Sequence, residues 1–113
     1  MSNLEQEKQL LDGLALNDGA VIESIYRDNY PVIQSFILNN NGNSDEARDI
    51  FQEAMIVIYE KAVSGNFELN CLLKTYIYSV CRRLWLKRLH QLQRYGSLVE
   101  NIEETVAVEE DLE

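Results

Sequence analysis

Asp49, Gln52, Glu53 and Ile56 are the residues whose types and spacing first suggest a specific chemistry. In a helix, which turns by roughly 100° per residue, all four side chains would lie on one face. Asp49 and Glu53 are like charges four residues apart, and such a pair weakens an isolated helix slightly. An acidic helix face with an isoleucine at its centre is typical of a surface onto which a basic helical partner docks. The alternative is an acidic face that is only solvated.

Cations are interleaved with aromatic residues in a later part of the chain. No acidic residue occurs from Leu69 to Val99. The cations of this stretch are Lys74, Arg82, Arg83, Lys87, Arg88 and Arg94. With Tyr78 and Trp85 among them, the pattern suits a nucleic-acid strand, because cations hold phosphates and rings stack on bases. The alternatives are that the rings only cover the edge of the core, and that the cations are solvated or neutralised by the chain's own acidic faces.

The formal net charge of −9 over 113 residues argues, taken alone, against a nucleic-acid-binding protein. The charge is divided unevenly, however, because the cations of residues 69–99 contribute +6 and the remaining residues therefore carry −15. This separation predicts two partners of opposite charge. With 46% hydrophobic residues, a chain of this length supports one globular domain with its own core.

Residues for catalysis or metal binding are scarce. The chain has one histidine, His90, and two cysteines, Cys71 and Cys81. These three residues cannot provide the four ligands of a structural zinc site, and no Glu-x-x-His pair of a di-metal bundle occurs. We therefore expect no enzymatic activity and no cofactor, and we predict that both cysteines are buried thiols. A carboxylate-metal enzyme is the least favoured alternative.

The distribution of apolar residues also bears on location. No apolar run approaches the ~20 residues of a membrane span. Met1 to Glu5 lack the basic start and apolar stretch of a secretory signal. We expect a cytoplasmic protein without a membrane partner, in a compartment that keeps its cysteines reduced.

Hydrophobic periodicity and turn signals predict an all-α fold, a compact domain of four helices. The predicted helices span residues 2–16, 19–39, 44–63 and 70–95. Ser2-x-x-Glu5 would form a capping box at the first, Pro31 should kink the second, and Ser44 should cap the third. Gly96 is the expected stop of the fourth helix.

Apolar residues at helical spacing predict the core faces of the third and fourth helices. The third contributes Phe51, Ala54, Met55, Ile58 and Ala62, and the fourth contributes Leu73, Ile77, Val80 and Leu84. The acidic residues of the third helix would then point away from the core. The rings and cations of the fourth helix would lie on the two flanks of its core stripe.

Three segments resemble the extracytoplasmic-function sigma factors of bacterial RNA polymerase, over roughly residues 4–95. Residues 22–31 are similar to the family's first conserved segment, with Ile-Tyr and then Tyr-Pro. Residues 44–53, Ser-Asp-Glu-Ala-Arg-Asp-Ile-Phe-Gln-Glu, resemble its Asp-Ala-Glu-Asp-Leu-x-Gln-Glu segment. Residues 73–83 share the frame of its Phe-x-x-Trp-Leu-x-x-Ile-Ala-Arg-Asn segment. The resemblance implies the family's region two domain, and the order and separation of the three segments support it.

The resemblance also implies partners and site residues. Asp49, Gln52, Glu53 and Ile56 would contact the clamp helices of the polymerase β′ subunit. The loop from Ser64 to Asn70 and the fourth helix would recognise and hold the melted minus-ten promoter element on the non-template strand, with one base extruded from the duplex into a pocket. The residues expected to bind DNA are Asn66, Phe67, Lys74, Tyr78, Arg82, Arg83, Trp85 and Lys87. An anti-sigma factor is a further class of partner, and an adaptor that docks a basic partner without binding DNA is the alternative function.

The chain departs from the family pattern at several positions. Arg83 stands where the family usually has asparagine, and Lys87 where aspartate is common, so the base preference does not carry over. Leu73, Tyr76 and Met55 replace larger aromatic residues and preserve apolar volume. We assign residues 1–95 to the region two domain and the acidic residues 96–113 to a tail or the start of an interdomain linker. The family's second domain, which reads the minus-thirty-five element, has no counterpart in the 113 residues.

Overall fold

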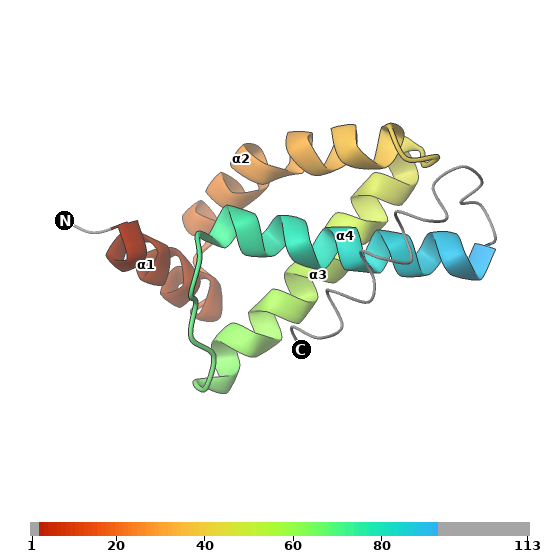
Figure 1. The fold of residues 1–113 in the computed structure, drawn as a ribbon. Helices are drawn as coiled ribbons and strands as arrows, with labels where there is room; N and C mark the ends of the chain where they lie inside the picture. The colour runs from red at the N-terminus through yellow and green to blue at the C-terminus, as the bar shows by residue number, and fades with distance from the viewer. Residues whose placement is uncertain (1–2, 93–113) are drawn as a thin grey trace.

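Two short polar turns and one longer loop, residues 65–72, divide the chain into four helices in the computed structural model, which describes residues 3–92 (Figure 1). The helices are α1 (Asn3–Ala15), α2 (Gly19–Leu38), α3 (Ser44–Ser64) and α4 (Leu73–Leu92). The predicted all-α class and the four-helix count are confirmed for this part of the chain. The predicted capping residue Ser2, the stop at Gly96 and the acidic residues 96–113 lie outside the described residues.

Polar side chains and left-handed residues form the turns. Asn17 adopts a φ of 60°, and the Asp18 carboxylate accepts hydrogen bonds from the Ala20 and Val21 amides, which caps α2. At α3 the predicted cap, Ser44, is wrong by one residue. Asn43 is the cap, and its side chain and that of Glu46 form a reciprocal capping box. Gly65, with a φ of 78°, ends α3 in the left-handed conformation that glycine adopts readily.

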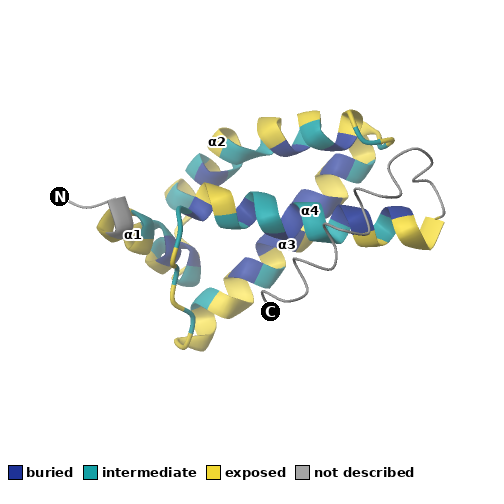
Figure 2. Cartoon of the chain, in the orientation of Figure 1, coloured by how far each residue is buried: buried dark blue, intermediate teal, exposed yellow. Residues whose placement is uncertain are grey.

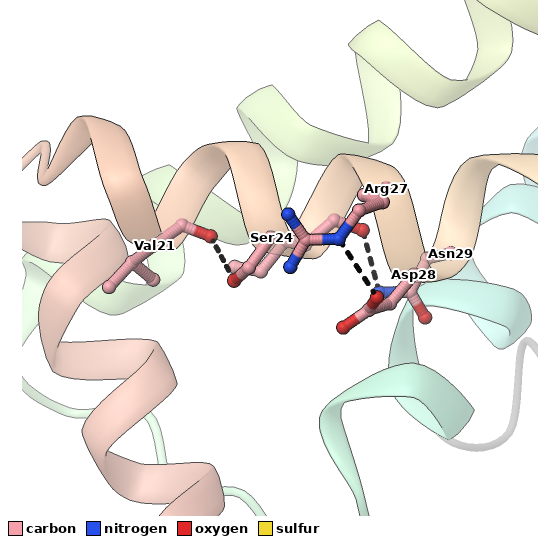
Figure 3. A network of polar contacts seen from close by, with 6 residues as sticks. Val21, Ser24, Arg27, Asp28 and Asn29 are labelled. Atoms are coloured by element: carbon pink, nitrogen blue, oxygen red, sulfur yellow. Dashed lines mark hydrogen bonds and ion pairs between the residues drawn. The ribbon is translucent and has the colours of Figure 1, made fainter.

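Helix α2 contains polar side chains that bond back to its own backbone (Figure 3). The Ser24 hydroxyl donates to the Val21 carbonyl at 2.8 Å, and the Asn29 amide donates to the Ile25 carbonyl at 2.8 Å. Such bonds compete with the helix ladder and favour local bending. Figure 1 shows α2 changing direction near its middle, the part of the helix that contains Pro31.

Helix α3 lies at the centre of the fold and contacts the other three helices. One face of α3 is buried and the other is open to solvent (Figure 2). Phe51 is fully buried, and Tyr26 and Tyr30 of α2 present ring edges to it, with centroids 4.7 and 5.5 Å away. The predicted core face is confirmed, since Phe51, Ala54, Met55 and Ile58 are buried and Ala62 is partly buried.

Helix α4 crosses α3 (Figure 1), and its Trp85 side chain contacts the turn between α2 and α3. Its first half buries Leu73, Ile77 and Val80, as predicted. In its second half Leu84, also predicted for the core, is only partly buried, and Trp85 is fully buried instead. The Trp85 indole N–H donates to the Asn40 carbonyl at 3.0 Å. Without this hydrogen bond, burial of the indole N–H away from water would cost free energy of folding.

A long-range hydrogen bond joins α1 to the start of α4. The Glu7 carboxylate accepts from the Leu73 backbone N–H at 2.5 Å. The first N–H groups of a helix have no partner within the helix, so this carboxylate acts as a cap supplied by another element. Glu7 thereby also holds the end of the loop that leads into α4.

Gly42 and Gly19 provide a matched test of the packing around Trp85. A Cβ at Gly42 would lie 2.7 and 2.8 Å from two carbons of the Trp85 ring and would also overlap Ile37, whereas a Cβ at Gly19 would meet nothing. We expect Gly42→Ala to lower the free energy of unfolding by about 1–3 kcal/mol through overpacking. Gly19→Ala should leave it unchanged or raise it by up to about 1 kcal/mol. Urea unfolding of both variants measures the difference, and equal stabilities would contradict this account of the turn.

Candidate functional site

The outer face of α3 carries the first group of predicted site residues. Asp49, Gln52, Glu53 and Ile56 are all exposed, and 58% of Ile56 is accessible to solvent. Since the opposite face of α3 forms the core, their placement on one outward face is confirmed (Figure 2). We call these four residues the acidic face. Whether a partner binds it stays a prediction at this point.

Glu53 forms an ion pair with a residue of another helix of the same chain. Arg88 of α4 lies with its guanidinium 3.5 Å from the Glu53 carboxylate, and 50% of the Glu53 side chain stays exposed. An ion pair with this exposure contributes about 0–1 kcal/mol to stability. Glu53 therefore lies at the edge of the acidic face, and Asp49 and Ile56 are its fully outward members.

A groove of about 610 Å³ lies between the loop after α3 and the outer side of α4. We call it the loop groove. Its lining includes the loop residues Phe67 and Asn70, the α4 residues Tyr76 and Arg83, and Lys61 from the end of α3. Two cations, an amide and two rings thus line one cavity, together with one carboxylate, that of Glu68. This combination suits a nucleotide, because cations attract phosphate, rings stack on bases and amides bond to base edges.

The loop is held in place by its aromatic residue. The Phe67 ring packs on the Tyr76 ring with centroids 5.1 Å apart, and the Lys61 ammonium lies 5.8 Å from the centre of the Phe67 ring. Both contacts join the loop to the flanking helices α3 and α4. The groove is therefore formed before any ligand binds, which lowers the entropy cost of binding.

The structure does not gather all the predicted DNA-binding residues at the loop groove. Phe67 and Arg83 line it. The exposed Asn66 belongs to the same loop, and the exposed Lys87 follows Arg83 by one helical turn. Arg82 and Tyr78 are partly buried.

Two of the predicted residues line other cavities. Tyr78 borders a cavity against α2, where its ring lies 5.4 Å from that of Phe36. Lys74 borders a cavity that also contains the carboxylates of Glu7 and Asp28. We therefore place Lys74 and Tyr78 outside the loop groove.

Trp85 was expected to stack on nucleic acid, and its position contradicts this expectation. The side chain is 0% exposed, and its only polar atom is bonded to Asn40. A ring in this position cannot reach a base without breaking the core. The alternative was a ring that covers the edge of the core, and Trp85 is buried more deeply than that, as a member of the core itself.

Several residues that line the loop groove were not among the DNA-binding residues predicted from the sequence. Thr75 and Ser79 also line it, together with Cys71. Thr75, Ser79, Arg83 and Lys87 follow one another at intervals of four residues, a polar stripe along one side of the helix. That spacing was available in the sequence. The contribution of Lys61 was not, because it depends on how α3 meets the loop.

The described residues offer little to other kinds of site. Within residues 3–92 no three His, Cys, Asp or Glu side chains gather closely enough to hold a metal ion. None of the helices described is both long and apolar enough to cross a membrane. Cys71 is partly exposed, which differs from the predicted burial, whereas Cys81 is fully buried and burial raises the pKa of its thiol to about 12.

Comparison with known protein families identifies a match. The family model described as Sigma-70 region 2 matches residues 25–95, which is more than half of the chain. The matched residues include most of α2, together with α3, the loop groove and α4. No curated protein and no solved structure shows a significant match.

The two cysteines should differ sharply in reactivity. The thiolate is the reactive form, and the raised pKa of Cys81 keeps this thiol protonated until the pH approaches 12. At pH 8 we expect a thiol reagent to modify Cys71 alone in the folded protein and both cysteines in denaturant. Mass spectrometry of the modified peptides measures this, with Cys71→Ser as the control. Equal native reactivity of both thiols would contradict the described packing of α4.

Proposed function

The chain belongs to the Sigma-70 region 2 family, and on this premise we propose that it binds core RNA polymerase through α3 and holds melted promoter DNA in the loop groove and along α4. Membership makes it a sigma factor domain concerned with polymerase binding and promoter recognition. One observation carries the finer assignment: an exposed acidic face and a ring-lined basic groove occur on one small domain and share no residue.

The acidic face supports the protein half of the proposal. Asp49 and Ile56 point outward from a helix whose opposite side is fixed in the core. Their charge complements a basic helical element, and we assign that element to the clamp helices of the polymerase β′ subunit. Complementary charge accelerates association and selects the partner, and the exposed isoleucine adds apolar area at the centre of the contact.

The loop groove supports the DNA half. Extruding a base from a duplex costs a few kcal/mol of stacking and pairing. Stacking on an aromatic side chain returns about 1–3 kcal/mol per base, and the Phe67 and Tyr76 rings, which line the groove, would provide it. The cations Lys61, Arg83 and Lys87 would hold the flanking phosphates. We propose that a non-template base of the minus-ten element occupies the groove.

The proposal also includes the sigma factor subtype and its cellular location. The three segments that resemble extracytoplasmic-function sigma factors favour that subtype, which acts in the cytoplasm with the polymerase. Arg83, in place of the asparagine usual in that group, lines the groove and would change the base that it prefers. An anti-sigma factor would act by covering either surface. Catalysis belongs to the polymerase in this scheme.

The DNA contact can be tested with a single cation. We expect Arg83→Ala to weaken binding of a promoter-derived single-stranded oligonucleotide, measured by fluorescence anisotropy, by about five- to tenfold at low salt. The slope of log affinity against log salt should become shallower by about 0.7 for each phosphate that the variant no longer neutralises. Lys8→Ala, which removes an exposed cation from α1, is the control and should have no effect. Binding that is absent, or insensitive to salt, would instead favour an adaptor without a DNA role.

The polymerase contact can be tested at Asp49. We expect Asp49→Lys to reduce capture of core RNA polymerase in a pull-down at least tenfold, roughly the effect of a like charge in a protein interface. Helix content and the unfolding midpoint should stay close to those of the wild type, because Asp49 is exposed. Asp12→Lys, a charge reversal at an exposed residue of α1, is the control for charge alone. Undiminished capture by Asp49→Lys would show that the docking face lies elsewhere.

A further inference from the structure

The peptide group between Leu72 and Leu73 is hydrogen-bonded on both sides. Its N–H donates to the Glu7 carboxylate of α1, and its carbonyl accepts from the Thr75 and Tyr76 N–H groups at 3.0 and 3.1 Å. A peptide group is planar, so these three hydrogen bonds together fix its orientation. The approach of α1 to the start of α4 can be followed in Figure 1. Glu7 thus helps to set the direction in which α4 begins.

The same peptide group lies between two walls of the loop groove. Residues 69–71, immediately before it, line the groove, and so do Thr75 and Tyr76, shortly after it. A change in the orientation of the peptide group would therefore move the two walls relative to each other. The Phe67 ring packs on the Tyr76 ring and would move with it. Glu7 itself lines a different cavity, so it can affect a ligand in the groove only through this peptide group.

We propose that Glu7 is a positioning residue, which through its bond to the Leu73 N–H holds the loop groove in the shape that receives a base. The inference rests on the proposed function and adds to it a residue that lies outside the groove. Glu7 does not touch the nucleotide, which meets only the residues of the groove. An acidic residue thereby favours the binding of an anion, an effect opposite in sign to that of its own charge.

The packing around this hydrogen bond supports a role for the bond itself. Glu7 and Leu73 border a cavity of about 310 Å³ whose lining includes the polar residues Ser24 and Asn29 of α2. Side chains therefore do not fill the space beside the bond. The cavity is polar and large enough for water, which would satisfy the Leu73 N–H in a variant without the carboxylate but would not fix its direction. We therefore expect such a variant to stay folded while its groove changes shape.

Four variants separate the hydrogen bond from the charge. Glu7→Ala removes both, Glu7→Gln removes the charge and keeps an oxygen that can accept, and Glu7→Asp keeps the charge on a side chain too short for the bond. Asp12→Ala, the control, removes a carboxylate from an exposed position of α1. The readout is the affinity for a promoter-derived single-stranded oligonucleotide, measured by fluorescence anisotropy. A series of copies that each lack one base of the minus-ten element is measured in parallel.

The expected pattern differs between the intact and the base-deleted oligonucleotides. Glu7→Ala and Glu7→Asp should bind the intact oligonucleotide about five- to tenfold more weakly than the wild type, which is the size of one lost stacked base. Deletion of the base that occupies the groove should weaken the wild type by a similar factor and these two variants little, because they no longer hold that base. Glu7→Gln should stay close to the wild type. Asp12→Ala should equal the wild type or bind slightly more tightly, since the loss of a negative charge favours DNA.

Each other outcome has a defined meaning. Wild-type affinity in Glu7→Ala and Glu7→Asp would overturn the inference and leave the proposed function standing. Equal losses by these variants on the intact and on every base-deleted oligonucleotide would also overturn it, because they would indicate general damage to the fold, which circular dichroism checks. A wild-type chain that does not bind the oligonucleotide, or that binds every base-deleted copy equally well, would overturn both the proposed role of the groove and the inference.

Discussion

The contact of Phe51 with two tyrosine rings of α2 determines how the rest of the molecule is presented. Phe51 is fully buried, and edge-to-face packing by Tyr26 and Tyr30 depends on the orientation of its ring. This contact sets the rotation of α3 about its own axis. Helix α3 contacts the other three helices, so its rotation decides which of its own side chains point to solvent. The acidic face is the side of α3 that does not pack in the core.

The same constraint separates the two candidate surfaces. Helix α4 crosses α3 and is tied at its start by the Glu7 carboxylate and near its end by the Trp85 indole. Between these two points its outer side faces the loop after Gly65, and the loop groove forms there. Since α3 and α4 each bury one side and expose another, one small domain offers an acidic face on α3 and, elsewhere, a groove lined by Lys61 and Arg83. The Glu53–Arg88 pair is where the two helices' charges meet.

Much of the fold could be predicted from the sequence, because helix content depends mainly on local patterns. The core face of α3 follows from a regular spacing, and Asp18 and Gly65 act through bonds to near neighbours. Trp85 could not be placed in this way. The buried side of α4 changes along its length as the helix leaves α3 and reaches the turn at Asn40, so a single helical period does not describe it. Lys61 lines the loop groove, and Lys74 lines a cavity together with Glu7 and Asp28, through tertiary packing that no local pattern contains.

The burial of Trp85 has a practical consequence for spectroscopy. It is the single tryptophan of the chain, and its indole is shielded from water and hydrogen-bonded to the α2–α3 turn. Its fluorescence emission should therefore lie toward shorter wavelengths in the folded protein and shift to longer wavelengths when α4 separates from that turn. An oligonucleotide in the loop groove would not touch the indole. Intrinsic fluorescence thus reports on the integrity of the domain, and ligand binding requires an extrinsic dye.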